Sequence, residues 1–197
     1  LFLNGTATIE RSLIHGFYAA NLDAGLVNAG NLLIVNSTIS SSAAPYGTSG
    51  LHNLPTGVVE IYSSTISGDA VAPGSAVVEN EGSIAVRNVL IERIPTSLGT
   101  ACALTTGLSI VDLDGNSLAG DGSCWPLTAA QLFLAPLADN GGPTLTHALL
   151  PGSPAIDRAT NCTYDDEMAG LTPEGPARTD KRGMVRLGGG GWGVGAI

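Results

Sequence analysis

The chain has 197 residues, of which 44% are hydrophobic and only 13% are charged, and its formal net charge is −9. That length allows one ordinary domain or a short solenoid, and the acidic balance disfavours nucleic-acid phosphates and anionic membranes as partners. Gly, Ser, Thr, Asn and Ala replace the charged residues that exposed helix faces need, so the composition favours β-structure with many tight turns.

The chain begins at Leu1, without Met and inside the first repeat unit, so we expect it to be a processed or partial piece of a longer precursor. No run of about 18 apolar residues occurs, and we therefore expect no transmembrane helix in this segment. An acidic surface can recruit divalent cations, but solubility alone is a sufficient reason for it.

An internal repeat is the main signal in the first part of the chain. Five segments align on a glycine, and these glycines lie 25, 27, 25 and 25 residues apart. The longer interval contains Pro45 and Pro55, which suits a small insertion in a loop. The aligned segments begin at Gly5, Gly30, Gly57, Gly82 and Gly107.

Aliphatic residues recur at fixed distances from each glycine. Four residues after it stand Ile9, Ile34, Ile61, Val86 and Val111. Nine residues after it stand Ile14, Ile39, Ile66 and Ile91, with Asn116 in the fifth unit. Because side chains alternate along a strand, these two positions have opposite parity, and we expect a bend between them near Ser12, Ser37 and Ser64.

A further strand is expected before each glycine. It carries Leu26, Leu51, Val78 and Ala103, each followed two residues later by Asn28, Asn53, Asn80 and Thr105. Each unit thus holds about three short strands, as in one rung of a parallel β-helix, where like residues stack about 4.8 Å apart. We predict an all-β, right-handed parallel β-helix of about five 25-residue rungs over residues 1–119.

Two other architectures fit the repeat less well. A leucine-rich repeat needs several leucines per unit and often a helix, whereas β-branched residues dominate here and no helical period appears. An antiparallel sandwich would not require a constant spacing between its units.

The end of the last unit carries oxygen ligands at alternate positions. Asp112, Asp114 and Asn116 resemble the start of a calcium loop, because Ca²⁺ takes several oxygens from one short segment. The loop lacks Gly at its sixth position and Glu at its twelfth. We therefore prefer a polar turn here and keep calcium, the one cofactor considered, as the alternative.

Residues 120–197 follow the point at which Asn116 interrupts the apolar pattern, and they are rich in turns. Because the end of a solenoid exposes unpaired strand edges, we expect this region to form an irregular C-terminal cap on the last rungs. The pattern Thr128–Gln131 is typical of a capping box and predicts one helical turn through Leu134, ended by Pro136.

The segment Pro136–Arg158, with the sequence PLADNGGPTLTHALLPGSPAIDR, resembles the hallmark of choice-of-anchor Q domain proteins, a set of bacterial surface β-helices. Residues 179–183 (TDKRG) resemble a later TDQRG element, and residues 192–197 resemble the closing CDIGA-type sequence. The resemblance covers roughly residues 100–197 at the level of motifs. In one departure, Trp192 stands where the family usually has cysteine.

The resemblance implies an exported, extracellular or cell-surface protein with a sorting or anchoring signal beyond the last residue, and it implies no general enzymatic activity. It also implies a disulfide between Cys102 and Cys124, since the family often has a cysteine pair in this context and exported proteins keep disulfides. Cys162 is then left over, because its family partner is the cysteine that Trp192 replaces. It is expected to be buried and free, or bridged to another chain.

The three histidines are the candidates for catalytic acid–base groups. His147 follows the turn Asp139–Pro143, but we interpret it as packing of the cap, and we interpret His15 and His52 as isolated residues in rungs or corners. None belongs to a recognisable nucleophile motif. The acidic residues of the rungs form no recurring cluster on one face, as a lyase or hydrolase would need.

We therefore expect no catalytic site and predict a structural, adhesive or assembly role, for example as a filament or an accessory subunit of an extracellular complex. Its partners would be other protein chains or further rungs, contacted through the open N-terminal end. The alternative is a module that binds or degrades polysaccharide, as many parallel β-helices do. Fold alone does not decide between the two.

Overall fold

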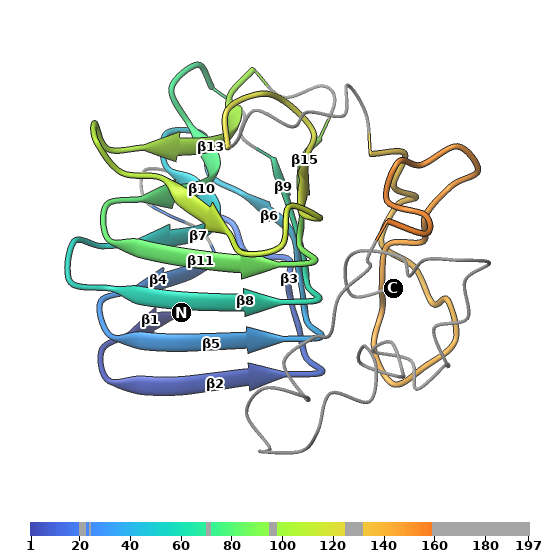
Figure 1. Ribbon diagram of the computed structural model, residues 1–197, viewed down its shortest axis with the longest axis horizontal. Helices are drawn as coiled ribbons and strands as arrows, with labels where there is room; N and C mark the ends of the chain where they lie inside the picture. Colours follow the sequence, from blue (N-terminus) through green and yellow to red (C-terminus); the bar gives the residue numbers. More distant parts are fainter. Residues whose placement is uncertain (20–22, 24, 70–71, 95–97, 125–131, 159–197) are drawn as a thin grey trace.

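The computed structural model describes residues 1–19, 23, 25–69, 72–94, 98–124 and 132–158. The strands of these residues form three parallel sheets around a common axis, so that the chain winds as a β-solenoid (Figure 1). Hydrogen-bonded neighbours within a sheet come from successive turns of the winding, and the described residues contain no helix. The predicted parallel β-helix is confirmed.

Each turn contributes one strand to each of the three sheets. Sheet A contains β1 (Phe2–Leu3), β4 (Leu26–Asn28), β7 (Thr48–Asn53), β10 (Ala76–Asn80) and β13 (Thr100–Leu104). Sheet B contains β2 (Thr6–Glu10), β5 (Asn31–Val35), β8 (Val58–Tyr62), β11 (Ser83–Arg87) and β14 (Ile110–Asp112). Sheet C contains β3 (Leu13–His15), β6 (Thr38–Ala43), β9 (Thr65–Asp69), β12 (Leu90–Arg93) and β15 (Leu118–Ala119).

Aliphatic columns run along the inside of the solenoid, at the positions that the repeat predicts. One column in sheet B contains Ile9, Ile34, Ile61 and Val86 as successive register partners. The column in sheet C contains Ile14, Ile39, Ile66 and Ile91. Ile34, Ile61 and Ile66 are fully buried, whereas Ile9 and Ile14 in the first turn are only partly buried. Burial of these columns is the main force that holds the turns together.

An asparagine ladder fills the corner between sheets A and B. Asn28, Asn53 and Asn80 are fully buried, and the Nδ2 of Asn53 donates to Oδ1 of Asn80 at 3.0 Å. The repeated glycines are required here for lack of space, since a Cβ on Gly57 would lie 2.0 Å from Oδ1 of Asn53. A Cβ on Gly82 would lie 2.4 Å from the carbonyl oxygen of Gly57. In the middle units the marker glycine therefore lies at a corner too tight for a side chain.

The corner between sheets B and C is built from left-handed residues followed by serine. Asn36 and Ser63 have φ angles of 46°, and the next residues are Ser37 and Ser64. The Oγ of Ser64 accepts from the backbone N–H of Ser37 at 3.1 Å, and Ser37 does the same for Ser12 at 3.1 Å. These bonds satisfy backbone groups at the bend that the serines predict.

The last turn departs from the prediction by one residue. Ile110, not Val111, stacks on Ile84, while Val111 pairs with Ala85 and is 51% exposed. The prediction that Val111 belongs to the core is therefore wrong. A slip of one residue reverses every side chain of a strand, and the chain keeps the bulkier Ile110 inside.

The same displacement affects the neighbouring positions of the last turn. Cys102, not Ala103, continues the column of Val78, and Leu104 rather than Thr105 follows Asn80. In sheet C, Ala119 stacks on Ile91, so the solenoid continues past Asn116. Gly107, on which the alignment rests, has a φ of +89° and open space around it, unlike the crowded Gly57 and Gly82. It forms a turn of a different kind, which explains why it misleads the alignment.

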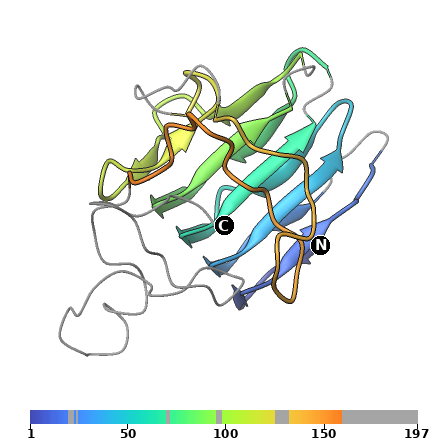
Figure 2. The same cartoon turned by 90° about the vertical axis from the view of Figure 1, so that its right-hand side faces the viewer.

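Residues 132–158 lie along the outer side of sheet C, from the last turn to the first, rather than across the end of the solenoid (Figure 2). Leu132 and Ala155 are fully buried in a second apolar cluster with Leu90 and Leu118. Leu134 forms an antiparallel bridge with Leu149. Most of the helical turn predicted from Thr128 lies outside the described residues. Within the part that the structure describes, no helical segment has the length and apolarity needed to cross a membrane.

Candidate functional site

The outer face of sheet A carries a group of five polar residues, which we call the sheet A cluster. Along β7, Leu51 and Asn53 point into the solenoid, so His52 between them points outward. His52 pairs with Glu79 of β10, and their side chains are therefore neighbours on adjacent strands. The other members of the cluster are Asp23, Thr48 and Glu81.

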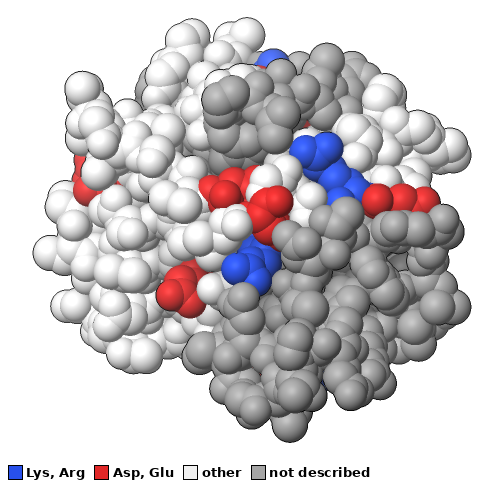
Figure 3. Space-filling model, in the orientation of Figure 1, with Lys and Arg blue, Asp and Glu red and all other residues white. Residues whose placement is uncertain are grey.

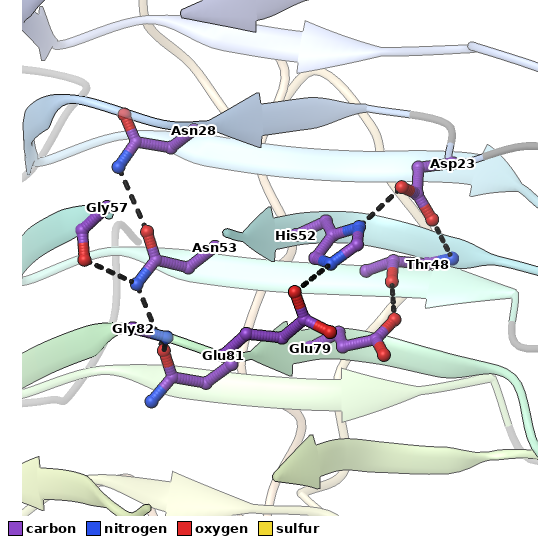
Figure 4. A network of polar contacts seen from close by, with 10 residues as sticks. Asp23, Asn28, Thr48, His52, Asn53, Gly57, Glu79, Glu81 and Gly82 are labelled. Carbon is purple, nitrogen blue, oxygen red and sulfur yellow. Dashed lines mark hydrogen bonds and ion pairs between the residues drawn. The ribbon is translucent and has the colours of Figure 1, made fainter. Parts of the chain in front are cut away.

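Hydrogen bonds join four members of the cluster into one chain (Figure 4). The Nδ1–H of His52 donates to Oδ2 of Asp23 at 2.5 Å, and the backbone N–H of Thr48 donates to Oδ1 of Asp23 at 2.7 Å. The hydroxyl of Thr48 donates to Oε2 of Glu79 at 2.7 Å. On the other side of the ring, Nε2 of His52 lies 3.8 Å from Oε2 of Glu81. One imidazole is thus held between carboxylates that face both of its nitrogens.

The acidic surroundings change the proton affinity of this histidine. The hydrogen bond to Asp23 raises the pKa of His52 above its ordinary value, against the opposing effect of burial, and the charges of Glu79 and Glu81 add to the rise. Burial raises the pKa of Asp23, but the bonds from His52 and the Thr48 backbone outweigh it, and the net pKa is lowered. The cluster therefore favours a positive charge at its centre.

The sequence interpretation of His52 as an isolated residue is wrong. The repeat itself held the signal for part of the cluster, because His52 and Glu79 are 27 residues apart across the unit that contains the insertion. Asp23 could not be found in this way, since it lies in the loop before β4, where no column applies. Asp23, His52 and Glu79 each offer one ligand atom, and these atoms all lie within 4.8 Å of one another.

A pocket of about 450 Å³ lies between sheet C and residues 133–150. Its lining is mainly apolar and includes Phe133, Leu134 and Leu150. Within the lining, Nε2 of the buried His147 accepts from Oγ of Ser40 at 2.6 Å, and its Nδ1–H donates to the carbonyl oxygen of Ala135 at 2.7 Å. The histidine thus packs residues 132–158 onto the solenoid, as predicted, but it also has a serine partner that the sequence did not indicate.

Glu92 lies in the lining of the same pocket. Burial raises the pKa of its carboxyl group to about 7, well above the ordinary value of 4.5. Its Oε2 is buried without a hydrogen-bond partner, and the carboxyl group packs directly against Gly120. A buried carboxyl group of this kind makes the stability of the region dependent on pH.

Asp112 and Asp114, for which the sequence offered calcium as an alternative, lie at the last corner of the solenoid. The two carboxylate oxygens of Asp112 accept from the backbone N–H and the hydroxyl of Ser117, at 3.1 and 3.0 Å. The carboxylate of Asp114 accepts from the backbone N–H of Asn116 at 3.0 Å, and the carbonyl oxygen of Asn116 accepts from Arg158 at 3.0 Å. These bonds form the polar turn that we preferred, and calcium binding here stays a prediction.

A disulfide joins Cys102 to Cys124, the pair that the family resemblance implies. Beside it, Oδ2 of Asp121 accepts from the backbone N–H of Ala101 at 2.9 Å, and Oγ of Ser123 accepts from that of Cys102 at 2.8 Å. Residues 121–124 thus cover part of the free edge of β13. Cys162 lies outside the described residues.

No protein-family model matches this chain, and comparisons with curated proteins and with solved structures return no similar protein. A functional argument therefore depends on the side chains and edges described above.

Proposed function

We propose that this chain is a non-catalytic structural segment of an exported or cell-surface β-helix protein, and that the edge of its first turn stacks against another β-coil. The observation that carries the proposal is the open edge formed by β1, β2 and β3, which are the outermost strands of all three sheets at the same end. The disulfide between Cys102 and Cys124 supports an oxidising, extracytoplasmic environment.

Among the described residues, the apolar columns are less buried in the first turn than in the later turns. Ala7, Ile9 and Ile14 are partly buried, whereas their register partners Leu32, Ile34 and Ile39 are between 0% and 2% exposed. Leu1 and Phe2 beside them are 60% and 61% exposed. A second coil placed on this edge would bury the same columns that every later turn buries.

The backbone of the first turn is also ready for further pairing. The carbonyl oxygen of Gly5 accepts from the N–H of Asn31, and the N–H of Arg11 donates to the carbonyl oxygen of Val35. Both groups therefore face the second turn. Because the bonding direction alternates along a strand, the N–H and C=O groups of Thr6, Thr8 and Glu10 point to the open side. Unpaired edge groups of this kind are a template for another strand.

The surface is consistent with a structural module. The described part of the face shown in Figure 3 is mostly uncharged, with acidic and basic side chains near its middle and a few more toward its edges. Although the chain carries a net charge of −9, the carboxylate of its edge strands, Glu10, is paired with Arg11 at 3.6 Å, so the edge itself repels a second copy only weakly.

Self-association of the chain tests the proposal, since two copies can meet edge to edge through antiparallel pairing of their first turns. Sedimentation analysis over a range of concentrations is expected to detect a dimer. The substitution Thr8→Pro removes an outward N–H without removing an internal ladder bond, and we expect it to weaken the dimer at least about tenfold. Leu98→Lys changes an exposed side chain just before β13, away from the first turn, and serves as the control. A monomer at all concentrations, or a dimer that Thr8→Pro leaves intact, would overturn the proposal.

Polysaccharide binding is a second candidate, favoured by exposed aromatic rings near the sheet A cluster. Tyr46 is 77% exposed and stands two residues before Thr48, and Tyr18 is 71% exposed and bridges to Ala43. Aromatic faces beside carboxylates provide the stacking and hydrogen bonding that a sugar chain needs. Affinity electrophoresis in gels that contain polysaccharide tests this, and retardation that Tyr46→Ala does not reduce would argue against it.

A further inference from the structure

We propose that Asp23, His52 and Glu79 bind one divalent transition-metal ion, of the class of Zn²⁺ or Mn²⁺, on the outer face of sheet A. This inference is independent of the stacking role proposed above. It concerns a different face of the molecule, and neither proposal needs the other.

The three side chains provide a suitable set of donor atoms. Ligand atoms bound to one such ion lie about 3 Å apart, because metal–ligand distances are about 2.0–2.2 Å. In the structure the three candidate atoms lie within 4.8 Å of one another, and the Nδ1 of His52 is already 2.5 Å from Oδ2 of Asp23. Small rotations of the Asp23 and Glu79 side chains would therefore close the set around an ion, with no change in the backbone.

The surrounding contacts hold these donors in the orientation that a metal site needs. If the metal takes Nδ1 of His52, the Nε2–H points to the carboxylate of Glu81, which lies 3.8 Å away. A carboxylate on the far nitrogen is the usual partner of a metal-bound histidine. Thr48 fixes the other two ligands, because its N–H binds Asp23 and its hydroxyl binds Glu79. Each ligand thus already has an outer partner.

The charge of the cluster also favours a bound cation. Three carboxylates surround one imidazole, and Nε2 of this imidazole is buried and makes no hydrogen bond. The fold does not explain this composition, since the same outward column contains Val27 below His52 and Ala103 above Glu79. Apolar or small residues are therefore compatible with this column.

The ligand types select the metal. An imidazole nitrogen favours Zn²⁺ over Ca²⁺ and Mg²⁺, which prefer all-oxygen sites, and the two carboxylates are ligands that also suit Mn²⁺. Three protein ligands leave at least one position for water or a bound oxygen donor. Because the ligands come from three consecutive turns of the solenoid, the ion would join these turns and bind the folded state alone.

Metal binding to the full-length, disulfide-bonded chain tests the proposal. The protein is treated with a chelator, dialysed, and titrated separately with Zn²⁺, Mn²⁺, Ca²⁺ and Mg²⁺ in a calorimeter and in thermal unfolding. We expect one Zn²⁺ per chain, and a rise in Tm of about 5–10 °C at 100 times the Kd. We expect no comparable rise with Ca²⁺ or Mg²⁺. Co²⁺ in place of Zn²⁺ gives a visible absorption that reports nitrogen and oxygen ligation directly.

Single substitutions assign the ion to its ligands. His52→Gln and Glu79→Gln are expected to abolish the stoichiometric binding, and Glu81→Gln to weaken it about 10–100-fold through the lost partner of His52. Glu60→Gln removes an exposed carboxylate on sheet B and is the matched control, with unchanged affinity. Circular dichroism checks that each variant is folded, and Asp23→Asn replaces any that is not. Absence of Zn²⁺ and Mn²⁺ binding, equal binding of Ca²⁺, or binding that survives the ligand substitutions would overturn the proposal.

Discussion

Asn53 is the middle member of the asparagine ladder, and replacing it with alanine tests how much the buried amides contribute to stability. Its Nδ2 lies 3.1 Å from the carbonyl oxygen of Gly57, 3.0 Å from Oδ1 of Asn80 and 3.2 Å from the carbonyl oxygen of Ser83. Its Oδ1 accepts from Asn28 at 2.9 Å. Because an amide nitrogen has only two hydrogens, three acceptors share two bonds, and the side chain makes three bonds in total.

Each buried bond contributes about 0.5–1.5 kcal/mol net, so Asn53→Ala is expected to lower the free energy of unfolding by about 3 kcal/mol. The loss is moderated on both sides of the ladder. Asn28 keeps its bond to the carbonyl oxygen of Gly30 at 2.9 Å, and Asn80 keeps the N–H of Gly82 at 3.1 Å. A change of this size is a large part of the 5–15 kcal/mol that is typical of a domain.

Urea unfolding followed by far-UV circular dichroism, with the disulfide intact, measures the effect. Asn31→Ala is the matched control, because Asn31 is an exposed asparagine at the start of β5, and a change within about 0.5 kcal/mol is expected. A loss below about 1 kcal/mol for Asn53→Ala, or an equal loss in the control, would refute the reasoning that the ladder stabilises the corner.

Two further predictions concern Glu92 and the disulfide. The pKa of Glu92 in the folded state is about 7 and its ordinary value is 4.5, so the folded state binds the proton more tightly and stability should fall as pH rises from about 4.5 to 7. Because Glu92 is partly exposed, this fall in the free energy of unfolding is reduced to about 1–2 kcal/mol, and Glu92→Gln should abolish it. Urea denaturation of both proteins at several pH values measures the effect. If the free energies of unfolding of the two proteins change with pH in parallel, the reasoning is wrong. Replacing Cys102 and Cys124 together with alanine opens a loop with a sequence separation of 22 residues and should cost about 3 kcal/mol in urea unfolding; a cost below 1 kcal/mol would contradict it.

The interior of the solenoid could be predicted from sequence because residues at the same position of successive repeat units stack directly on one another. Ile34, Ile61 and Val86 occupy equivalent places in successive units, and the structure makes them direct register partners. The prediction failed in the last turn, where Gly107 resembles the other marker glycines in sequence but forms a turn of another kind. The spacing of the glycines does not say which residue of a strand the chain buries. In β14 the chain buries Ile110 in place of Val111, and this sets the register of β14 on β11.

The candidate site could be predicted from the sequence only in small part. His52 and Glu79 could have been found by applying the column rule to outward positions, since they are register partners. Asp23 comes from a loop to which no repeat applies. The contact between Ser40 and His147 joins residues 107 positions apart and depends on how residues 132–158 lie against sheet C. Contacts that loops and flanking segments make have no periodic signal.

The two kinds of column in this fold are under different constraints, and the difference helps to separate structural from functional residues. An inward polar residue must find all its partners within the solenoid, as Asn53 does with its neighbours in the ladder. An outward residue has water as an alternative partner, so stacking does not require His52 and Glu79 to be polar, and Val27 and Ala103 occupy the same column. Polar residues that recur inside a β-solenoid are therefore best explained by the fold. A polar group that interrupts an outward column for two turns, as this one does, calls for an explanation in terms of binding.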